Sequence, residues 1–264
     1  MSISSSTQPT KQEQLAAMRE FGNNANARLP VLFLLDASSS MNGIIRGDNQ
    51  HILRQEHSDG INWNIVTGDN IVTRMDELNV GLQRFVSDIL ADPLAKLAAD
   101  VAVITFARTV ATVKEFGPIR ESDTGLKIST SQENETLLGE AVELALAELD
   151  NRKRTYREHG VEYYQPWLVV MTDGIPTSTR HRELEGRLKK LTANRKLSVF
   201  VFGIGRADLS ELCSISPGRP PMQINDQKFP ELFAWLSRSV RMVSMSVPGD
   251  GVSLTPLPED VWQV

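Results

Sequence analysis

The sequence predicts an α/β protein with a doubly wound, mostly parallel central sheet flanked by helices. The first observation is length, because 264 residues suffice for one large α/β domain or two small ones. The second is a set of short apolar runs, which are typical of strands buried on both faces of a parallel sheet. The third is the helical spacing of apolar residues between the runs, and this alternation predicts the doubly wound arrangement. The runs are residues 31–35, 101–106, 167–171 and 197–204.

The first apolar run opens the region that we expect to form the domain. Residues 29–36 predict its first strand, and the polar residues 1–10 before it are expected to be disordered. Apolar residues near helical spacing predict a short helix over Gln12 to Phe21. The expected organisation is an N-terminal tail with this helix (1–28), a domain (29–246) and an extended, Pro- and Gly-rich C-terminal tail (247–264).

Residues 43–73 interrupt the alternation and form an insertion within the domain. They contain four glycines and many Asn, Asp, Gln and His residues, and they lack clear periodicity. A segment of this length without periodicity predicts a loop that is either functional or disordered. Within it, residues 63–72 fit a β-hairpin that turns at Gly68-Asp69.

The rest of the domain follows from periodicity and from the residues that end each element. Apolar positions at helical spacing predict a helix from Met75 that Asp92-Pro93 stops. Residues 109–116 alternate like an edge strand, and a polar loop follows at 117–135. The basic run 151–157 is expected to be a solvated helix end that leads to an irregular connection. The other predicted helices are 137–149, 181–191, 208–215 and 229–245, with Trp235 in the core, and the other strands are 167–173 and 221–224.

Composition narrows the class of protein. Hydrophobic residues make up 41% of the chain and charged residues 23%, which is ordinary for a globular protein. The net charge of −5 argues against nucleic acid or an anionic membrane as the main partner. No secretion signal or apolar stretch of about 20 residues is visible, so we expect a cytoplasmic protein. Cys213 is the only cysteine, so the chain has no disulfide framework. Cys213 lies in an apolar stretch, and we expect its side chain to pack there.

Oxygen-bearing side chains follow two of the predicted strands and open one helix. Asp36, Ser38 and Ser40 follow the first strand, Asp173 follows the strand at 167–173, and Thr136 lies where a helix begins. In a doubly wound sheet these two strands are neighbours and ligands bind beyond their carboxyl ends, so the five residues are expected to meet. Two close carboxylates repel each other unless a cation lies between them. Hydroxyls and carboxylates suit a hard cation, and we expect Mg²⁺ or another divalent ion such as Mn²⁺ or Ca²⁺.

Simpler interpretations of these residues need no metal. Asp and Ser favour turns and helix caps, so Asp36 and the serines could form a capped turn, and Asp173 a turn before Gly174. Thr136 could be a helix N-cap, a role compatible with metal binding. In the insertion, a solvated loop is favoured over a second metal site, because no metal-binding spacing is present there. The residues concerned are Asp48, His51, Glu56, His57 and Asp59, and the nearby Arg46-Gly47-Asp48 tripeptide is attributed to chance.

The ordered set Asp-x-Ser-x-Ser at 36–40, Thr136 and Asp173 resembles the metal-ion-dependent adhesion site of von Willebrand factor A domains. The resemblance covers roughly residues 29–245 and implies the Rossmann-like fold of that family. It also implies that Ser38, Ser40 and Thr136 bind Mg²⁺ through their hydroxyls, while Asp36 and Asp173 hold the ion directly or through water. An acidic residue from a partner protein would then complete the coordination.

Within this superfamily the chain is similar to the bacterial TerY-type domains of tellurite-resistance and stress-response systems. The similar stretches are 34–41, 136–141, 171–177, 202–205, 233–240 and 246–249. This resemblance implies a protein kinase and a PP2C-type phosphatase as partners. The insertion at 43–73 departs from the pattern, since a much shorter link is expected there, and it could cap the site or change the choice of partner.

These observations favour a non-enzymatic, metal-dependent interaction module that serves as a scaffold or adaptor. One alternative keeps the module but places it in a chelatase-like assembly with an AAA+ ATPase, and the sequence does not decide between the two. A Mg²⁺-dependent hydrolase or phosphotransferase is the less favoured alternative. Ser38 stands where a phosphoaspartyl motif needs its second Asp, and no nucleophile elbow, P-loop or kinase motif is present.

Overall fold

A computed structural model describes residue 21 and residues 26–58, 61–133, 135–174, 176–205 and 207–263. Most of the predicted helix at 12–21, and the tail before it, lie outside the described residues. The strands of the main sheet are β1 (Leu29–Asp36), β4 (Ala99–Phe106), β5 (Val110–Pro118), β6 (Trp167–Thr172), β7 (Ser198–Ile204), β8 (Met222–Ile224) and β9 (Trp262–Gln263). The helices are α2 (Arg74–Ala91), α3 (Pro93–Ala98), α4 (Leu138–Glu158), α5 (Arg180–Glu183), α6 (Glu185–Ala193), α7 (Leu209–Leu212) and α8 (Phe229–Ser244).

The sheet has the strand order β5-β4-β1-β6-β7-β8-β9, which confirms the predicted doubly wound topology. The five inner strands pair in parallel, and the edge strands β5 and β9 are antiparallel to their neighbours. Strand β1 lies between β4 and β6, with Leu35 opposite Thr105 on one side and Met171 on the other. The predicted edge strand at 109–116 is therefore β5, and the carboxyl ends of β1 and β6 lie side by side, as predicted.

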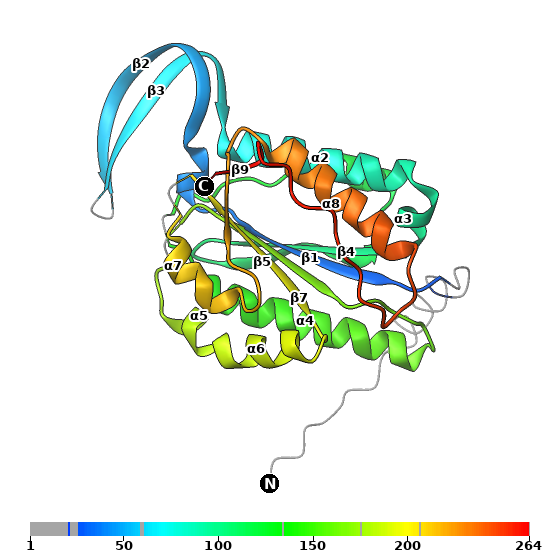
Figure 1. The fold of residues 1–264 in the computed structure, drawn as a ribbon. Helices are drawn as coiled ribbons and strands as arrows, with labels where there is room; N and C mark the ends of the chain where they lie inside the picture. The colour runs from blue at the N-terminus through cyan, green and yellow to red at the C-terminus, as the bar shows by residue number, and fades with distance from the viewer. Residues whose placement is uncertain are drawn as a thin grey trace, which may run out of the picture.

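Helices cover both faces of the sheet (Figure 1). Along β1, Val31, Phe33 and Leu35 point into the core under α2 and α8. The alternate residues Leu32 and Leu34 point into the core under α4 and α6. This alternation explains the unbroken apolar run, because a strand buried on both faces has no solvent side. The sheet is thereby packed between two hydrophobic layers.

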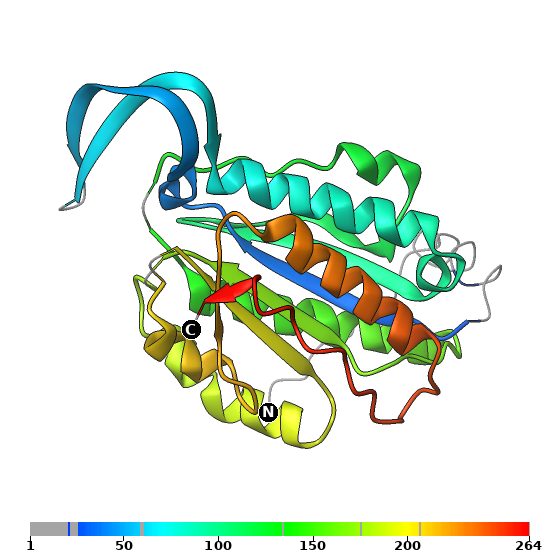
Figure 2. The same cartoon turned by 45° about the horizontal axis from the view of Figure 1, so that its top comes forward.

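The insertion is a long β-hairpin, which we call the arm, made of β2 (Ile44–Ser58) and β3 (Ile61–Thr73). It curves away from the body in both views (Figures 1 and 2). The expectation of a loop was wrong, and so was the turn at Gly68-Asp69, because both residues lie within β3 with Asp69 opposite Asp48. Four register irregularities disturb the period-two pattern that would have revealed the strands. In the sequence the two strands are separated by Asp59-Gly60, a dipeptide typical of hairpins.

Two further expectations need correction. Helix α4 runs through the basic segment to Glu158, and Arg152 within that segment is ion-paired to the buried Asp100 rather than solvated. Cys213 is exposed, because it lies in a 3₁₀ turn after the short helix α7 and does not point into the core. The C-terminal tail contains the edge strand β9, and it contacts the body where the buried Trp235 donates a 2.7 Å hydrogen bond to the carbonyl of Thr255. Trp235 is in the core, as predicted.

Close packing between α2 and α8 gives a stability prediction at Gly81. A Cβ at this position would lie 2.4 Å from Cδ2 of Phe233 and 3.0 Å from the carbonyl oxygen of Phe229. We expect Gly81→Ala to lower the free energy of unfolding by about 1–3 kcal/mol, because an overpacked core must shift. The control is Gly186→Ala in α6, where nothing lies within 4 Å of the added Cβ. It is expected to be neutral or to stabilise by up to about 1 kcal/mol. Urea unfolding of the two variants checks the difference, and equal effects would contradict the prediction.

Candidate metal site

The first loop of the site is built by the end of β1. The Asp36 carboxylate accepts a 2.8 Å hydrogen bond from the backbone N–H of Ser38, which turns the chain sharply after the strand. A 3₁₀ turn, Ser39–Asn42, follows, and its entry is held by the 3.1 Å bond from the Ser39 N–H to the Glu133 carbonyl. The hydroxyls of Ser38 and Ser40 consequently lie 2.9 Å apart. Asp36 thus forms a turn, as the simpler interpretation also expected, and this turn brings the two hydroxyls together.

The second loop follows β6 and joins the first through hydrogen bonds. The Ser40 hydroxyl donates a 2.6 Å bond to Oδ1 of Asp173. The Thr172 hydroxyl donates a 2.5 Å bond to Oδ2 of Asp36 and accepts a bond from the Gly174 N–H. Sequence analysis did not identify Thr172, although its position as the last residue of β6 beside the end of β1 could have suggested it.

Thr136 reaches the same cluster from the third loop. A Cβ on Gly174 would lie 2.9 Å from the Thr136 hydroxyl and 3.4 Å from Oδ2 of Asp36, so glycine lets the three loops approach. The backbone of Thr136 is held by bonds to Thr177 at 3.2 Å. Helix α4 begins at Leu138 with Leu137 as its N-cap, so the alternative role of Thr136 as the N-cap was wrong. The structure thus gathers all five residues of the predicted site.

Burial and mutual repulsion make the ionised forms of the two carboxylates in the cluster unfavourable. Asp36 is fully buried, and burial raises its pKa above the ordinary value despite hydrogen bonds from Ser38 and Thr172. Burial and then the charge of Asp36 raise the pKa of Asp173 to about 6, while hydrogen bonds from Ser40 and Arg74 act against this shift. Two carboxylates with raised pKa values at one strand edge favour a positive charge between them.

The residues present fit a hard divalent cation. Three hydroxyls and two carboxylates supply only oxygen ligands, and Gly174 has no Cβ to fill the space beside the Thr136 hydroxyl and Oδ2 of Asp36. This donor set suits Mg²⁺, Mn²⁺ or Ca²⁺ by its chemistry. Ser38, Ser40 and Thr136 would bind through oxygen, and the carboxylates would supply the opposite charge.

Arg74 and Asp226 also belong to the site, and sequence analysis missed both. Nη1 of Arg74 lies 3.1 Å from Oδ2 of Asp173, and its Nε lies 3.2 Å from Oδ2 of Asp226. Arg74 is the first residue of α2 and follows the arm directly. No motif in the sequence marks it, because its approach to Asp173 depends on how the arm folds back.

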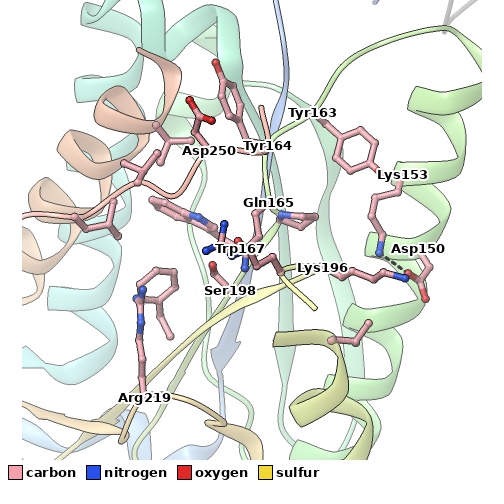
Figure 3. A pocket seen from close by; sticks show the side chains of 18 of the residues that line it. Asp150, Lys153, Tyr163, Tyr164, Gln165, Trp167, Lys196, Ser198, Arg219 and Asp250 are labelled. Atoms are coloured by element: carbon pink, nitrogen blue, oxygen red, sulfur yellow. Dashed lines mark ion pairs between the residues drawn. The ribbon is translucent and has the colours of Figure 1, made fainter. Parts of the chain in front are cut away.

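A second feature, a cavity of 490 Å³, lies at the opposite end of the sheet, where β6 and β7 begin (Figure 3). Its lining includes Trp167 and Phe200 from the strands and residues of the C-terminal tail. Five of the lining residues are Lys or Arg and two are Asp, and Lys153 is ion-paired to Asp150 at 2.7 Å. The cavity is therefore basic and separate from the cluster of Asp36 and Asp173.

The raised pKa of Asp173 predicts that metal affinity depends on pH. A cation binds the ionised carboxylate, and with a pKa of about 6 only about a tenth of it is ionised at pH 5. We expect the Mg²⁺ dissociation constant to be about tenfold higher at pH 5 than at pH 7.5, as measured by titration calorimetry. Because the folded pKa lies above the ordinary value of 3.8, the metal-free protein should lose stability as pH rises from about 4 through 6. An affinity unchanged between pH 5 and 7.5 would contradict the prediction.

A doubly wound sheet with Asp-x-Ser-x-Ser, Thr and Asp loops at its carboxyl edge defines the class of von Willebrand factor type A folds. The sequence matches the von Willebrand factor type A domain over residues 66–234, and the chain belongs to this family. The match begins within β3, so the Asp-x-Ser-x-Ser loop lies before it, separated by most of the arm. No curated protein matches in sequence. Within the described part of the chain, no helix has the length and apolar character to cross a membrane.

Solved structures that share the fold include a bacterial protein and a mussel protein. BatB from Bacteroides thetaiotaomicron, described as a conserved hypothetical protein, is 17% identical with a TM-score of 0.52, and the match covers 83% of this chain and all of BatB. Proximal thread matrix protein 1 from the mussel byssus is 16% identical with a TM-score of 0.50, and the match covers 81% of this chain. This chain spans about half of the mussel protein, at 46% of its length. Identities this low support the shared fold alone.

Proposed function

We propose that this chain is a metal-dependent protein-interaction module. The observation that carries the proposal is the single cluster of Asp36, Ser38, Ser40, Thr136 and Asp173, in which a hydrogen bond joins the loop after β1 to the loop after β6. Mg²⁺, or Mn²⁺ or Ca²⁺, binds the three hydroxyls, and the two carboxylates balance its charge. A carboxylate from a partner protein takes the remaining position on the ion. That carboxylate is desolvated on binding, so its loss weakens the complex by several kcal/mol.

The chemistry of the cluster supports a binding role rather than catalysis. Histidine and cysteine, the usual proton-transfer and nucleophilic groups, are absent from the sequence of the three loops, residues 36–43, 131–137 and 172–177. The Ser40 hydroxyl donates to a carboxylate and is held in place by it. These features favour a module that presents a metal ion to a partner over one that activates a nucleophile.

The partner proposed here is a bacterial signalling protein of the kind implied by the TerY-like resemblance, either a protein kinase or a PP2C-type phosphatase in the cytoplasm. The arm adds a recognition surface beside the metal, because it begins at Ile44 directly after the metal loop. It exposes Ile52 and Leu53, whose relative exposures are 58% and 66%. An AAA+ ATPase is the alternative partner, and pull-down followed by mass spectrometry distinguishes the two.

The test combines metal titration with partner capture. Thr136→Val keeps the side-chain shape and removes one proposed ligand, so we expect Mg²⁺ affinity to fall by about 10–100-fold and capture of the partner to be lost. Thr192→Val in α6 is the matched control, since that hydroxyl bonds to carbonyls of its own helix, and it should bind normally. Capture that persists in EDTA and with a folded Thr136→Val protein would refute the metal-bridged mechanism.

A further inference from the structure

The side chain of Arg74 lies against the proposed metal site from the base of the arm. Its backbone N–H donates a 3.0 Å bond to the Gly43 carbonyl, so the first residue of α2, directly after the arm, is tied to the metal loop. The guanidinium then extends over the loop and donates to Asp173 at 3.1 Å, to the Ser40 carbonyl at 3.3 Å and to Asp226 at 3.2 Å. The Arg74 side chain is 21% exposed, whereas that of Asp173 is 1% exposed.

Two glycines from different loops make the space for this guanidinium. A Cβ on Gly43 would lie 2.4 Å from Nη1 of Arg74, and a Cβ on Gly205 would lie 2.6 Å from Nη2. Gly205 has a φ of +58°, and its carbonyl accepts a 2.9 Å bond from Gln223. The slot therefore admits a flat guanidinium and holds it in one place, which differs from a mobile surface arginine.

The position of Arg74 brings it into competition with a bound cation. Arg74 supplies positive charge to Asp173 through Oδ2, while Oδ1 accepts the Ser40 hydroxyl. A divalent ion bound at the hydroxyls needs the same negative charge and is repelled by the guanidinium. Asp226 holds the Nε side of Arg74, so the guanidinium cannot leave the slot freely.

We propose that Arg74 is a built-in cation that competes with the metal for Asp173 and thereby couples metal binding to the base of the arm. This inference rests on the proposed metal site. Metal binding weakens the ion pair between Arg74 and Asp173, which loosens the junction where β3 passes into α2. Because coupling is reciprocal, a partner that moves the arm raises the affinity for metal.

The test measures metal affinity with Mn²⁺ as the probe, by calorimetry and electron paramagnetic resonance. Arg74→Met is expected to bind Mn²⁺ at least about fivefold more tightly than the unchanged protein. Arg84→Met is the matched control, because Arg84 lies on the same helix and, among the described residues, pairs only with Asp88, so it should leave the affinity unchanged. Arg74→Lys keeps the charge without the guanidinium fork, so an intermediate affinity is expected, and it serves as the second variant if Arg74→Met does not fold.

Hydrogen exchange provides the second readout. In the unchanged protein, Mg²⁺ should speed amide exchange at residues 44–46 and 72–74, whereas in Arg74→Met exchange there should be fast and independent of metal. Equal or weaker Mn²⁺ binding by Arg74→Met would overturn the competition, and unchanged exchange would overturn the coupling. If neither the folded unchanged protein nor the folded variant binds Mn²⁺, the proposed metal site itself fails and this inference fails with it.

Discussion

Asp36→Asn is expected to reduce Mg²⁺ affinity at least about 100-fold while leaving the metal-free fold intact. The side chain is fully buried and accepts hydrogen bonds from the Ser38 N–H and the Thr172 hydroxyl. An amide of the same shape can accept from the Ser38 N–H through its oxygen and donate through its nitrogen to the Thr172 hydroxyl, which then acts as the acceptor. What the substitution removes is one of two negative charges that balance the cation. Because that charge also repels Asp173, the metal-free variant should be as stable as the unchanged protein or more stable at pH 8.

Thermal melts with and without Mg²⁺ measure both effects. A ligand present at 100 times its dissociation constant stabilises a fold by about 2.7 kcal/mol, so the unchanged protein should melt at a higher temperature with Mg²⁺ and Asp36→Asn should not. The control is Asp208→Asn, which alters a carboxylate that caps α7 outside the cluster and should retain the Mg²⁺ shift. A Mg²⁺ shift of normal size in folded Asp36→Asn would exclude Asp36 from the metal site.

The central sheet was predictable because its strands are buried on both faces. Val31 to Leu35 forms an apolar run that only a buried strand or helix satisfies, and its length favours the strand. The arm was not predictable in the same way. Its residues are largely solvated and its register shifts repeatedly, with Asn49 and Asn70 at positive φ, so no face of the hairpin has a regular apolar pattern. A buried element requires regularly spaced apolar residues in the sequence, and the exposed arm lacks such spacing.

The five oxygen-bearing residues were predictable because strand order alone brings them to one edge. Asp36 and Asp173 follow adjacent parallel strands, and their proximity follows from topology. Arg74 was not predictable, because its contact with Asp173 requires two strands of the arm to return to Gly43 before α2 begins. The position of the Arg74 guanidinium thus depends on the arm, whose fold the sequence did not predict. The same limit applies to Arg152, where a basic run at a helix end gave no sign of the buried carboxylate on β4.

Arg152→Met is expected to lower the free energy of unfolding by about 3–5 kcal/mol. The guanidinium donates two hydrogen bonds to Oδ2 of Asp100, at 2.8 Å from Nε and 2.5 Å from Nη2, and the Tyr156 hydroxyl donates to the same oxygen. Asp100 is almost fully buried. Removing the arginine leaves this carboxylate in the interior without its counter-charge, and desolvation of the unpaired charge exceeds the value of the lost contacts. The neighbouring Tyr156 is fully buried as well, and this burial raises the pKa of its hydroxyl.

Urea unfolding at 25 °C tests this prediction, with Arg154→Met as the control. Arg154 lies two residues further along α4, is exposed and bonds only to Asn151 among the described residues, so its loss should cost within about 0.5 kcal/mol. The double variant Asp100→Asn/Arg152→Met should recover part of the lost stability, because the buried carboxylate that lost its counter-charge is then neutral. If Arg152→Met costs no more than Arg154→Met, the ion pair does not stabilise the junction of α4 and β4. Recovery of stability in the double variant would show that Arg152→Met destabilises the fold because the Asp100 carboxylate is left unpaired.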